Sequence, residues 1–339
     1  MADRLRIGIV GAGPVTERYH LSAIRGVPEV CPTFIIDIDP YRAQGFAERN
    51  CFPHWGTQAS DMAGTVDLAI VALPNHLHAS VTAELLSQGI HVLCEKPMAR
   101  TADECKTMVE AARRSGTLLA IGHNRRFKDH FQLAKEWLEK GLIGQITSIA
   151  AEEGSASDWQ RSPAYFDPAQ SGGGSLLDVG IHAIDLIRWL AGEFADVQFA
   201  GDGNSSRVEG EAEMRFRLQS GATGKIVCSR SRELAQSLTF TGTEGSLQAG
   251  LWGDQLRVRT NRGKPFRHFP HLDAFVSRRP PADPSFVNQL YNLVQAIRGR
   301  GSLLVSGAEG MAAVDVVCRA YESIADPARL IAVAQVGTR

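Results

Sequence analysis

Short runs of apolar residues alternate with longer amphipathic segments over the first 120 residues of the chain. Apolar runs of four to eight residues are typical of strands buried on both faces, and helical periodicity between them is typical of βαβ units with a parallel sheet. We therefore expect an α/β fold with a doubly wound parallel sheet here. The expected strands are 5–10, 33–36, 68–73, 91–94 and 118–121, and the expected helices are 16–25, 41–49, 79–88 and 102–114.

The second half of the chain has a different pattern. Apolar and polar residues alternate strictly over 211–219, and Ser220-Gly221 offers a hairpin turn into the next apolar run. This alternation predicts half-buried strands in an open, mainly antiparallel sheet with one wet face. The other expected strands are 145–153, 223–229, 237–241 and 255–259, and the expected helices are 175–190 and 308–324.

The change of pattern predicts two domains, which suits a chain of 339 residues. We place a parallel-sheet domain at 1–122 and a second α/β domain at 123–339. We also expect the last helix to pack back on the first domain.

Composition narrows the class of protein. Lys plus Arg number 36 against 37 Asp plus Glu, which argues against a dedicated nucleic-acid-binding protein. No apolar run approaches the ~20 residues that a membrane span needs, and the first residues do not resemble a secretory signal. Six irregularly spaced cysteines without a C-x-x-C pair indicate reduced thiols. We expect a cytoplasmic protein that uses neither membrane nor nucleic acid.

A glycine-rich turn follows the first expected strand and opens a helix. In dinucleotide folds one glycine makes such a turn and another lets the backbone approach the pyrophosphate at the helix N-terminus. Thr16 stands where the third glycine of the pattern would be. The residues that we expect to contact the cofactor here are Gly11, Gly13, Pro14 and Val15.

An acidic residue at the end of the second strand extends this pattern. Asp37 lies 24 residues after Gly13, where a carboxylate binds the ribose 2′-hydroxyl. Because the same carboxylate repels a 2′-phosphate, NAD is favoured, and the nearby Arg42 leaves NADP open. The alternative is a glycine turn in an α/β fold that binds no nucleotide.

Four ordered motifs resemble the Gfo/Idh/MocA family of oxidoreductases: GAGPVTERYH at the first turn, ALPNHLH after the third long apolar run, EKP at 95–97, and GGGSLLDVGIHAIDLIRWL at 172–190. The tail at 306–324 is similar to the closing helix of that family. The resemblance implies a Rossmann domain followed by a substrate-binding domain whose open sheet serves as an oligomer interface. It further implies a sugar, cyclitol or related substrate, and a homodimer or homotetramer formed through the second sheet.

The candidate catalytic residues are Lys96, Asp178 and His182. Lys96 lies just past the carboxyl end of a strand, where ligands bind in open α/β sheets. Asp178 and His182 are spaced i, i+4 on the helix expected at 175–190. By resemblance they match the catalytic pair of the family, with His182 as general acid/base and the other two binding the reacting oxygen. The sequence leaves open whether Lys96 or His182 moves the proton. Asp185 is expected to be structural.

Further positions follow from the resemblance. Pro74 and Asn75 are expected beside the nicotinamide, and Glu95 near its ribose. The candidates for substrate contact are Asn124, Arg125, Trp159 and Tyr165. The alternatives are a solvated hinge for the first two of these and aromatic packing under a loop for the other two.

The residues also allow three alternatives: a metal site, a hydrolase and a regulatory protein. A metal site on Asp178 and His182, with His76 and His78 added, has suitable residue types, but nicotinamide chemistry needs no metal. We expect no metal. An NAD-dependent glycoside hydrolase of the same fold and a non-catalytic NAD-binding regulator are both open. The leading expectation is an NAD(P)-dependent oxidoreductase that transfers a hydride between nicotinamide and a carbinol or ketone carbon.

Overall fold

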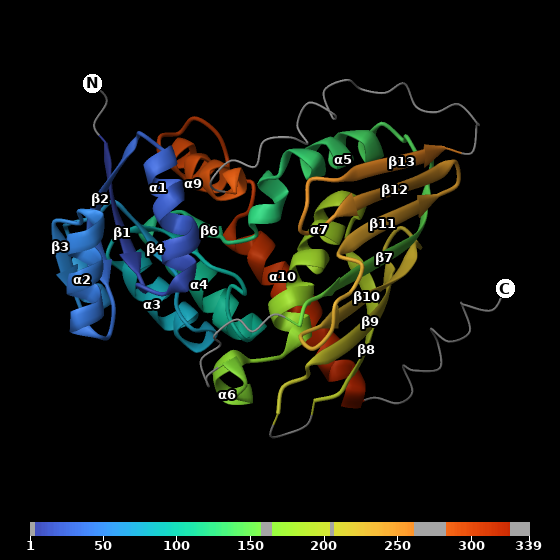
Figure 1. Ribbon diagram of the computed structural model, residues 1–339, viewed down its shortest axis with the longest axis horizontal. Coiled ribbons are helices and arrows are strands. Elements are labelled where there is room, and N and C mark those ends of the chain that lie inside the picture. Colours follow the sequence, from blue (N-terminus) through green and yellow to red (C-terminus); the bar gives the residue numbers. More distant parts are fainter. Residues whose placement is uncertain (1–3, 157–164, 204–206, 261–282, 326–339) are drawn as a thin grey trace. The chain divides into compact units, whose positions relative to one another are not determined.

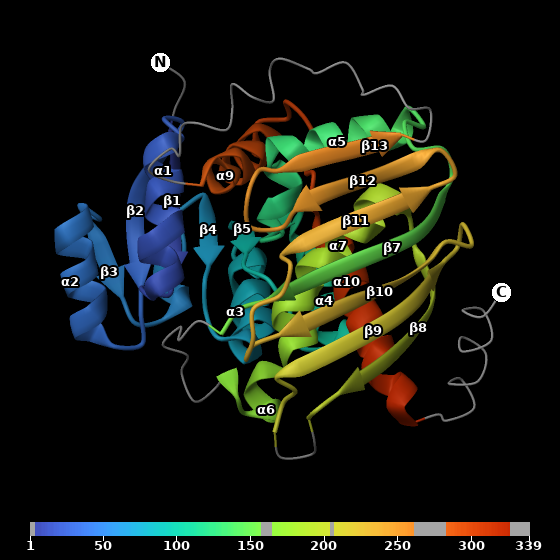
Figure 2. The same cartoon turned by 45° about the vertical axis from the view of Figure 1, so that its right-hand side comes forward.

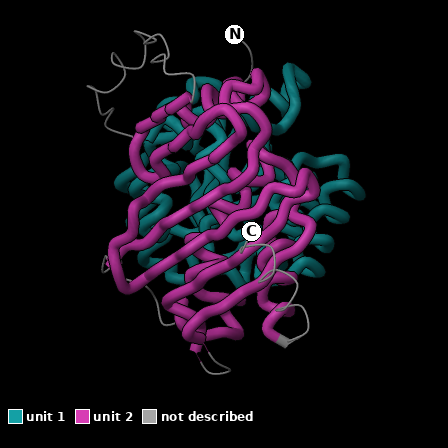
Figure 3. Tube along the Cα trace, turned by 90° about the vertical axis from the view of Figure 1, so that its right-hand side faces the viewer, with its two compact units in different colours: residues 1–127, 280–312 teal, residues 128–279, 313–339 magenta. Residues whose placement is uncertain are grey.

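The computed structural model describes residues 4–156, 165–203, 207–260 and 283–325. The chain forms two compact units (Figure 3): unit 1 comprises residues 1–127 and 280–312, and unit 2 comprises residues 128–279 and 313–339. The division at 122 expected from the sequence differs from these units, because residues 280–312 group with the N-terminal part of the chain.

Unit 1 is built on a six-stranded parallel sheet in the order β3-β2-β1-β4-β5-β6 (Figure 1). This is the doubly wound arrangement predicted from the apolar runs, and all five expected strands are present. Strand β3, which has three residues, was not predicted from the sequence. The bounds are β1 Leu5–Val10, β2 Val30–Ile36, β3 His54–Gly56, β4 Leu68–Val71, β5 His91–Cys94 and β6 Leu119–Ile121.

The helices of unit 1 begin at polar caps or at turns that follow strands. The Asp39 carboxylate caps α2, and the Thr101 hydroxyl caps α4, which ends at Gly116 in the left-handed region. The first helix starts as one π-helical turn, η1. The helical bounds are η1 Thr16–His20, α1 Leu21–Gly26, α2 Pro40–Asn50, η2 Ala59–Met62, α3 Asn75–Ser87, α4 Ala102–Ser115, η3 Asn124–Phe127 and α9 Pro284–Ile297.

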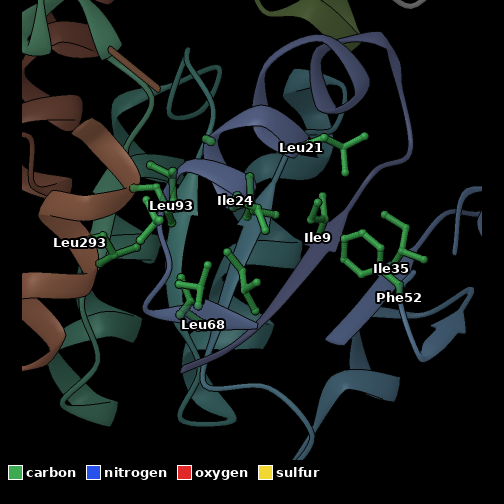
Figure 4. Packing of buried hydrophobic residues seen from close by; sticks show 14 of the residues in the cluster. Ile9, Leu21, Ile24, Ile35, Phe52, Leu68, Leu93 and Leu293 are labelled. Atoms are coloured by element: carbon green, nitrogen blue, oxygen red, sulfur yellow. The ribbon is translucent and has the colours of Figure 1, made fainter. Parts of the chain in front are cut away.

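Helix α9 is distant in sequence but completes the core of unit 1. Leu290, Leu293 and Val294 are fully buried with side chains of β1, β2 and α1 (Figure 4). Each buried leucine of this kind contributes roughly 1.5–3 kcal/mol of hydrophobic free energy. The apolar face of α9 thus explains why residues 280–312 belong to unit 1.

Unit 2 contains a seven-stranded sheet in the order β13-β12-β11-β7-β10-β9-β8. Its central pair, β7 and β10, is parallel and the other pairs are antiparallel, which confirms the mainly antiparallel sheet. Strands β8 and β12 were not predicted from the sequence. The bounds are β7 Ile146–Gly154, β8 Phe194–Gly201, β9 Glu211–Leu218, β10 Thr223–Ser229, β11 Ser237–Gly242, β12 Gly245–Gly250 and β13 Leu256–Thr260.

The alternation along β9 divides the two faces of this sheet as predicted. Met214 and Phe216 are buried, whereas Arg215 and Arg217 are exposed. Helices α5 (Asp129–Glu139) and α7 (Ile181–Ala191) lie on the buried face (Figure 2). In the described part of unit 2, no helix covers the opposite face. The remaining helices of this part of the chain are α6 Pro168–Ser171 and the π-helical turn η5 Leu176–Gly180.

The closing helix α10 (Gly307–Glu322) begins in unit 1 and ends in unit 2, followed by η6 (Ser323–Ala325). Its first turns pack within unit 1. A Cβ atom on Gly310 would lie 2.6 Å from the Ile121 side chain, and Glu309 accepts a hydrogen bond from the buried Arg126 at 2.7 Å. No helix among the described residues is long and apolar enough to cross a bilayer.

Candidate functional site

Several of the predicted site residues meet at one edge of the unit 1 sheet. The parallel strands β2, β1, β4 and β5 lie side by side and end at this edge. The glycine turn, Asp37, Pro74 and Lys96 follow these four strands and are therefore placed at the same edge. This is the edge where open α/β sheets bind ligands.

The glycine turn leaves room for a ligand. Gly11 has φ +106°, and a Cβ atom there would lie 2.2 Å from the Ala72 carbonyl oxygen, so no other residue fits. A Cβ atom on Gly13 would meet nothing within 4 Å. The open space at Gly13, next to the start of a helix, fits the diphosphate of a dinucleotide.

Thr16 replaces the third glycine of the pattern without disturbing the turn. Its side chain is fully buried, and its hydroxyl donates a 2.6 Å hydrogen bond to the Gly11 carbonyl oxygen. Threonine is thus small enough for this position and adds a bond that ties the helix to the turn.

Asp37 is buried beside the glycine turn. Its carboxylate accepts 3.0 Å hydrogen bonds from the backbone N–H groups of Ala12 and Asp39. Arg42, which is 55% exposed, pairs with the same carboxylate at 3.5 Å. Asp37 therefore braces the turn from within the protein. Pro14 and Val15 are exposed at the start of the helix.

Glu95 links the first helix to the lysine. The His20 ring nitrogen Nε2 lies 3.0 Å from Glu95 Oε1, and the Lys96 backbone N–H donates to Oε2 at 3.1 Å. Burial alone would raise the pKa of Glu95, but His20 and the Lys96 charge outweigh it and lower that pKa. Glu95 is therefore held as a carboxylate, and it orients the backbone of the half-buried Lys96.

His78 connects two loops at the same edge. Its fully buried ring has Nδ1 2.8 Å from the Pro97 carbonyl oxygen and Nε2 2.8 Å from the Leu73 carbonyl oxygen. Carbonyl oxygens only accept, so both nitrogens donate and the ring carries two protons. Burial opposes this charge, but Cys94 and the two carbonyl groups outweigh it and raise the pKa of His78 to about 9.

The other unit 1 candidates have different surroundings. Pro74 precedes α3 and Asn75 is its first residue. Asn124 and Arg125 are buried in η3, and the Asn124 amide donates to the Ser285 hydroxyl at 2.8 Å. The solvated hinge that was the alternative for these two residues is therefore wrong.

In unit 2 a buried carboxylate organises the GGGSLLDVG motif. Glu209 accepts from the backbone N–H groups of Gly174 at 3.0 Å and Leu176 at 3.1 Å, and from the Tyr321 hydroxyl at 2.7 Å. A carboxylate is favourable at a helix N-terminus. A Cβ atom on Gly174 would lie 2.1 Å from the Glu209 carbonyl oxygen. Burial and the Glu209 charge raise the pKa of Tyr321, so its hydroxyl stays protonated.

Asp178 lies in η5 within a polar cluster. The Tyr165 hydroxyl donates to its Oδ2 atom, and the Arg230 guanidinium pairs with the same atom at 3.5 Å. The Arg230 guanidinium carbon lies 4.0 Å from the centre of the Tyr165 ring.

His182 is half-buried in the first turn of α7, and Asp185 is buried further along. Trp159 lies outside the described residues.

Four residues of these surroundings were not predicted as site residues from the sequence: His20, His78, which was considered only as an added metal ligand, Glu209 and Arg230. The first two lie inside the quoted motifs, so polar residues within them were an available signal. Glu209 and Arg230 contact the motif only through the fold, and no local pattern marks them.

Among the described residues, no group of three or more His, Cys, Asp or Glu side chains could hold a metal ion.

Most of the chain is similar to known oxidoreductases. Residues 5–123 match an oxidoreductase family domain with an NAD-binding Rossmann fold, and residues 131–248 match the GFO/IDH/MocA C-terminal domain. Levoglucosan dehydrogenase of Pseudarthrobacter phenanthrenivorans is 28% identical over 288 residues, which cover 72% of this chain and 73% of that enzyme. Inositol 2-dehydrogenase of Rhizobium meliloti is 24% identical over 331 residues, covering 95% and 97%.

A solved structure supports the same fold. The WlbA dehydrogenase from Bordetella pertussis, in complex with NADH and UDP-GlcNAcA, has a TM-score of 0.82 at 21% identity and covers 96% of this chain and 97% of its own. The two matched domains follow each other as the sequence resemblance predicted. The chain belongs to the Gfo/Idh/MocA family of NAD-binding oxidoreductases.

Proposed function

We propose that this chain is an NAD-dependent dehydrogenase or reductase that acts on a carbinol or ketone carbon of a sugar, cyclitol or sugar derivative. The observation that carries the proposal is the position of Lys96. It follows a strand at the edge that also bears the glycine turn, and its backbone N–H donates to Glu95, which in turn pairs with His20. The relatives named above act on levoglucosan and inositol, which supports this substrate class.

The cofactor-binding residues in this proposal belong to unit 1. Gly11, Gly13, Pro14 and Val15 surround the diphosphate, and Asp37 binds the ribose that carries adenine. Pro74, Asn75 and Glu95 are assigned to the nicotinamide side. The buried carboxylate of Asp37 favours NAD, because a 2′-phosphate would be repelled there.

The catalytic roles follow from side-chain chemistry. Bound NAD supplies the hydride acceptor. His182 takes the proton from the substrate hydroxyl in the oxidation direction, since an imidazole ring can act as a general base. Lys96 donates a hydrogen bond to the reacting oxygen, and Asp178 orients it. Asn124, Arg125, Trp159 and Tyr165 are proposed to contact the rest of the substrate.

The assembly proposed for this protein is a homodimer or homotetramer formed through the unit 2 sheet. One face of that sheet carries no described helix, and its exposed strand residues are polar and charged. No nucleic-acid or membrane partner is proposed. The relatives named above are dehydrogenases, which gives the hydrolase alternative no support.

The first test is a titration of the purified protein with NADH and with NADPH, in which binding is measured by quenching of tryptophan fluorescence. We expect tighter binding of NADH. The second is incubation with NAD⁺ and a panel of D-glucose, levoglucosan, myo-inositol and D-glucuronate, with NADH formation as the readout. Binding of NADH together with unchanged nicotinamide absorbance for every compound, over a wide range of pH, would contradict the proposed activity and favour a regulatory protein.

A further inference from the structure

Arg230 follows β10 in unit 2 and is buried, with a side-chain exposure of 5%. Its Nη2 atom donates to the Gly174 carbonyl oxygen at 3.1 Å and lies 3.5 Å from Asp178 Oδ2. The Tyr165 ring covers one face of the guanidinium at 4.0 Å. The group is therefore fixed in place by one of its three nitrogens and by one face.

The other two nitrogens have no such contacts. Nε and Nη1 of Arg230 are buried, and no residue in the described part of the chain accepts a hydrogen bond from either. Buried polar groups in folded proteins are almost always hydrogen-bonded, and an unsatisfied donor on a charged group is especially unfavourable. Two unsatisfied donors on one buried cation therefore require an explanation.

The neighbours of these donors indicate what satisfies them. Asp178 and Tyr165 were both predicted as site residues from the sequence, and both contact Arg230. Guanidinium groups donate hydrogen bonds and accept none, so the missing partner has to present hydrogen-bond acceptors. Sugars, cyclitols and sugar acids carry acceptor oxygens on adjacent carbons.

We propose that Arg230 is a substrate-binding residue that donates from Nε and Nη1 to acceptor oxygens of the bound sugar or cyclitol. This inference rests on the proposed function and adds a specificity-determining residue to it. The acceptors are either the oxygens of a carboxylate group or those of neighbouring hydroxyl groups. A carboxylate pairs more strongly with arginine than a hydroxyl does, so the two sources differ in affinity.

The test measures equilibrium binding, so that it does not depend on turnover. The wild-type protein is saturated with NADH, which cannot oxidise an alcohol, and is titrated with D-glucuronate and with myo-inositol by calorimetry. In Arg230→Met we expect the affinity for the bound probe to fall about 10- to 100-fold, with NADH affinity unchanged. Arg230→Lys keeps the charge but offers fewer donors, and we expect an intermediate loss.

Arg232→Met is the matched control. Arg232 lies two residues further on, is 58% exposed and pairs with Glu211 at 2.9 Å. We expect its probe affinities to equal those of the wild type. Should Arg230→Met fail to fold, which a thermal melt would show, Arg230→Lys carries the test.

The outcomes separate the sources and the two proposals. A selective loss of D-glucuronate binding supports a carboxylate partner, and an equal loss for both probes supports hydroxyl partners. Unchanged affinities in the folded Arg230 variants, or no binding of either probe by the wild type, would overturn the inference. The proposed function fails separately, if the NAD⁺ panel yields no NADH.

Discussion

Three polar side chains at the edge of the unit 1 sheet, Asp37, Glu95 and His78, are satisfied by neighbours of their own unit, whereas Arg230 in unit 2 is not. Each of the three has hydrogen-bond partners within unit 1, from the turns and the helix around it. Arg230 keeps two buried donors without an acceptor among the described residues. The difference indicates that the cofactor edge is built in advance, while the cluster around Asp178 is completed by its ligand.

The largest effect is expected from Lys96→Ala. If the unit 1 edge is built in advance, removing this side chain should lower kcat about 10²- to 10⁴-fold and leave NADH affinity within about threefold. Steady-state kinetics and tryptophan quenching measure the two quantities. Lys106→Ala, an exposed position on α4, is the control. Comparable losses of kcat and NADH affinity would show that Lys96 supports the fold of the edge instead.

The next effect concerns the charge on His78. Because its pKa is raised to about 9 from 6.5, the protonated ring contributes about 3 kcal/mol to folding. This contribution is complete below pH 6.5 and is lost as the pH rises towards 9. The free energy of unfolding of the wild type, measured in urea, should therefore fall over this pH range. That of His78→Gln should not.

Nuclear magnetic resonance of the imidazole nitrogens provides a direct check on His78. At pH 7.5 both ring nitrogens should carry protons. A singly protonated ring would contradict the two-donor assignment. His54→Gln, on the exposed strand β3, should leave the pH dependence of unfolding unchanged.

Two glycine variants separate folding from cofactor binding at the turn. Gly11→Ala places a methyl group against the Ala72 carbonyl oxygen and should cost about 2–3 kcal/mol of stability. Gly13→Ala meets only open space, so it should leave the melting temperature unchanged and weaken NADH binding. Equal NADH affinity in Gly13→Ala and the wild type would contradict the placement of the diphosphate.

The smallest effect is expected from Arg42→Ala. The exposed pair with Asp37 at 3.5 Å contributes less than about 1 kcal/mol to stability. We expect NADH affinity to change less than about fivefold. We expect NADPH affinity to fall, because Arg42 is the cation next to the Asp37 carboxylate, where the ribose is proposed to bind. Arg49→Ala, an exposed position on the same helix, is the control. Tighter NADPH binding in Arg42→Ala would reverse the assigned role of this arginine.

Local patterns predicted most of the strands. A strand buried on both faces gives a continuous apolar run, and a strand buried on one face gives alternating apolar and polar residues. The strand β1 and the alternation in β9 are examples, and both were predicted to within one residue. The strand β12, GSLQAG, lacks the β-branched residues that mark strands, and it forms through pairing with β11 and β13. Helix α9 was not predicted from the sequence, although the face that it buries is clearly apolar. The segment that precedes it in the sequence is of mixed polarity.

The candidate site divides in the same way. Residues inside motifs, such as Gly11 and Lys96, were found because the motif fixes their position on an element. Glu209 and Arg230 were not found, because the fold brings them to the motif from 33 residues or more away in sequence. Their roles come from hydrogen bonds that no spacing in the chain encodes.

The return of residues 280–312 to unit 1 has a consequence for how the chain is made. Unit 1 needs Leu290, Leu293 and Val294 from α9 to close its core, so it stays incomplete while the whole of unit 2 up to that helix is being synthesised. Domains usually fold in order from the N-terminus as they leave the ribosome. Here the first unit to emerge cannot complete its core until α9 has been synthesised. A fragment that ends at Phe127 would expose the apolar surface that α9 covers.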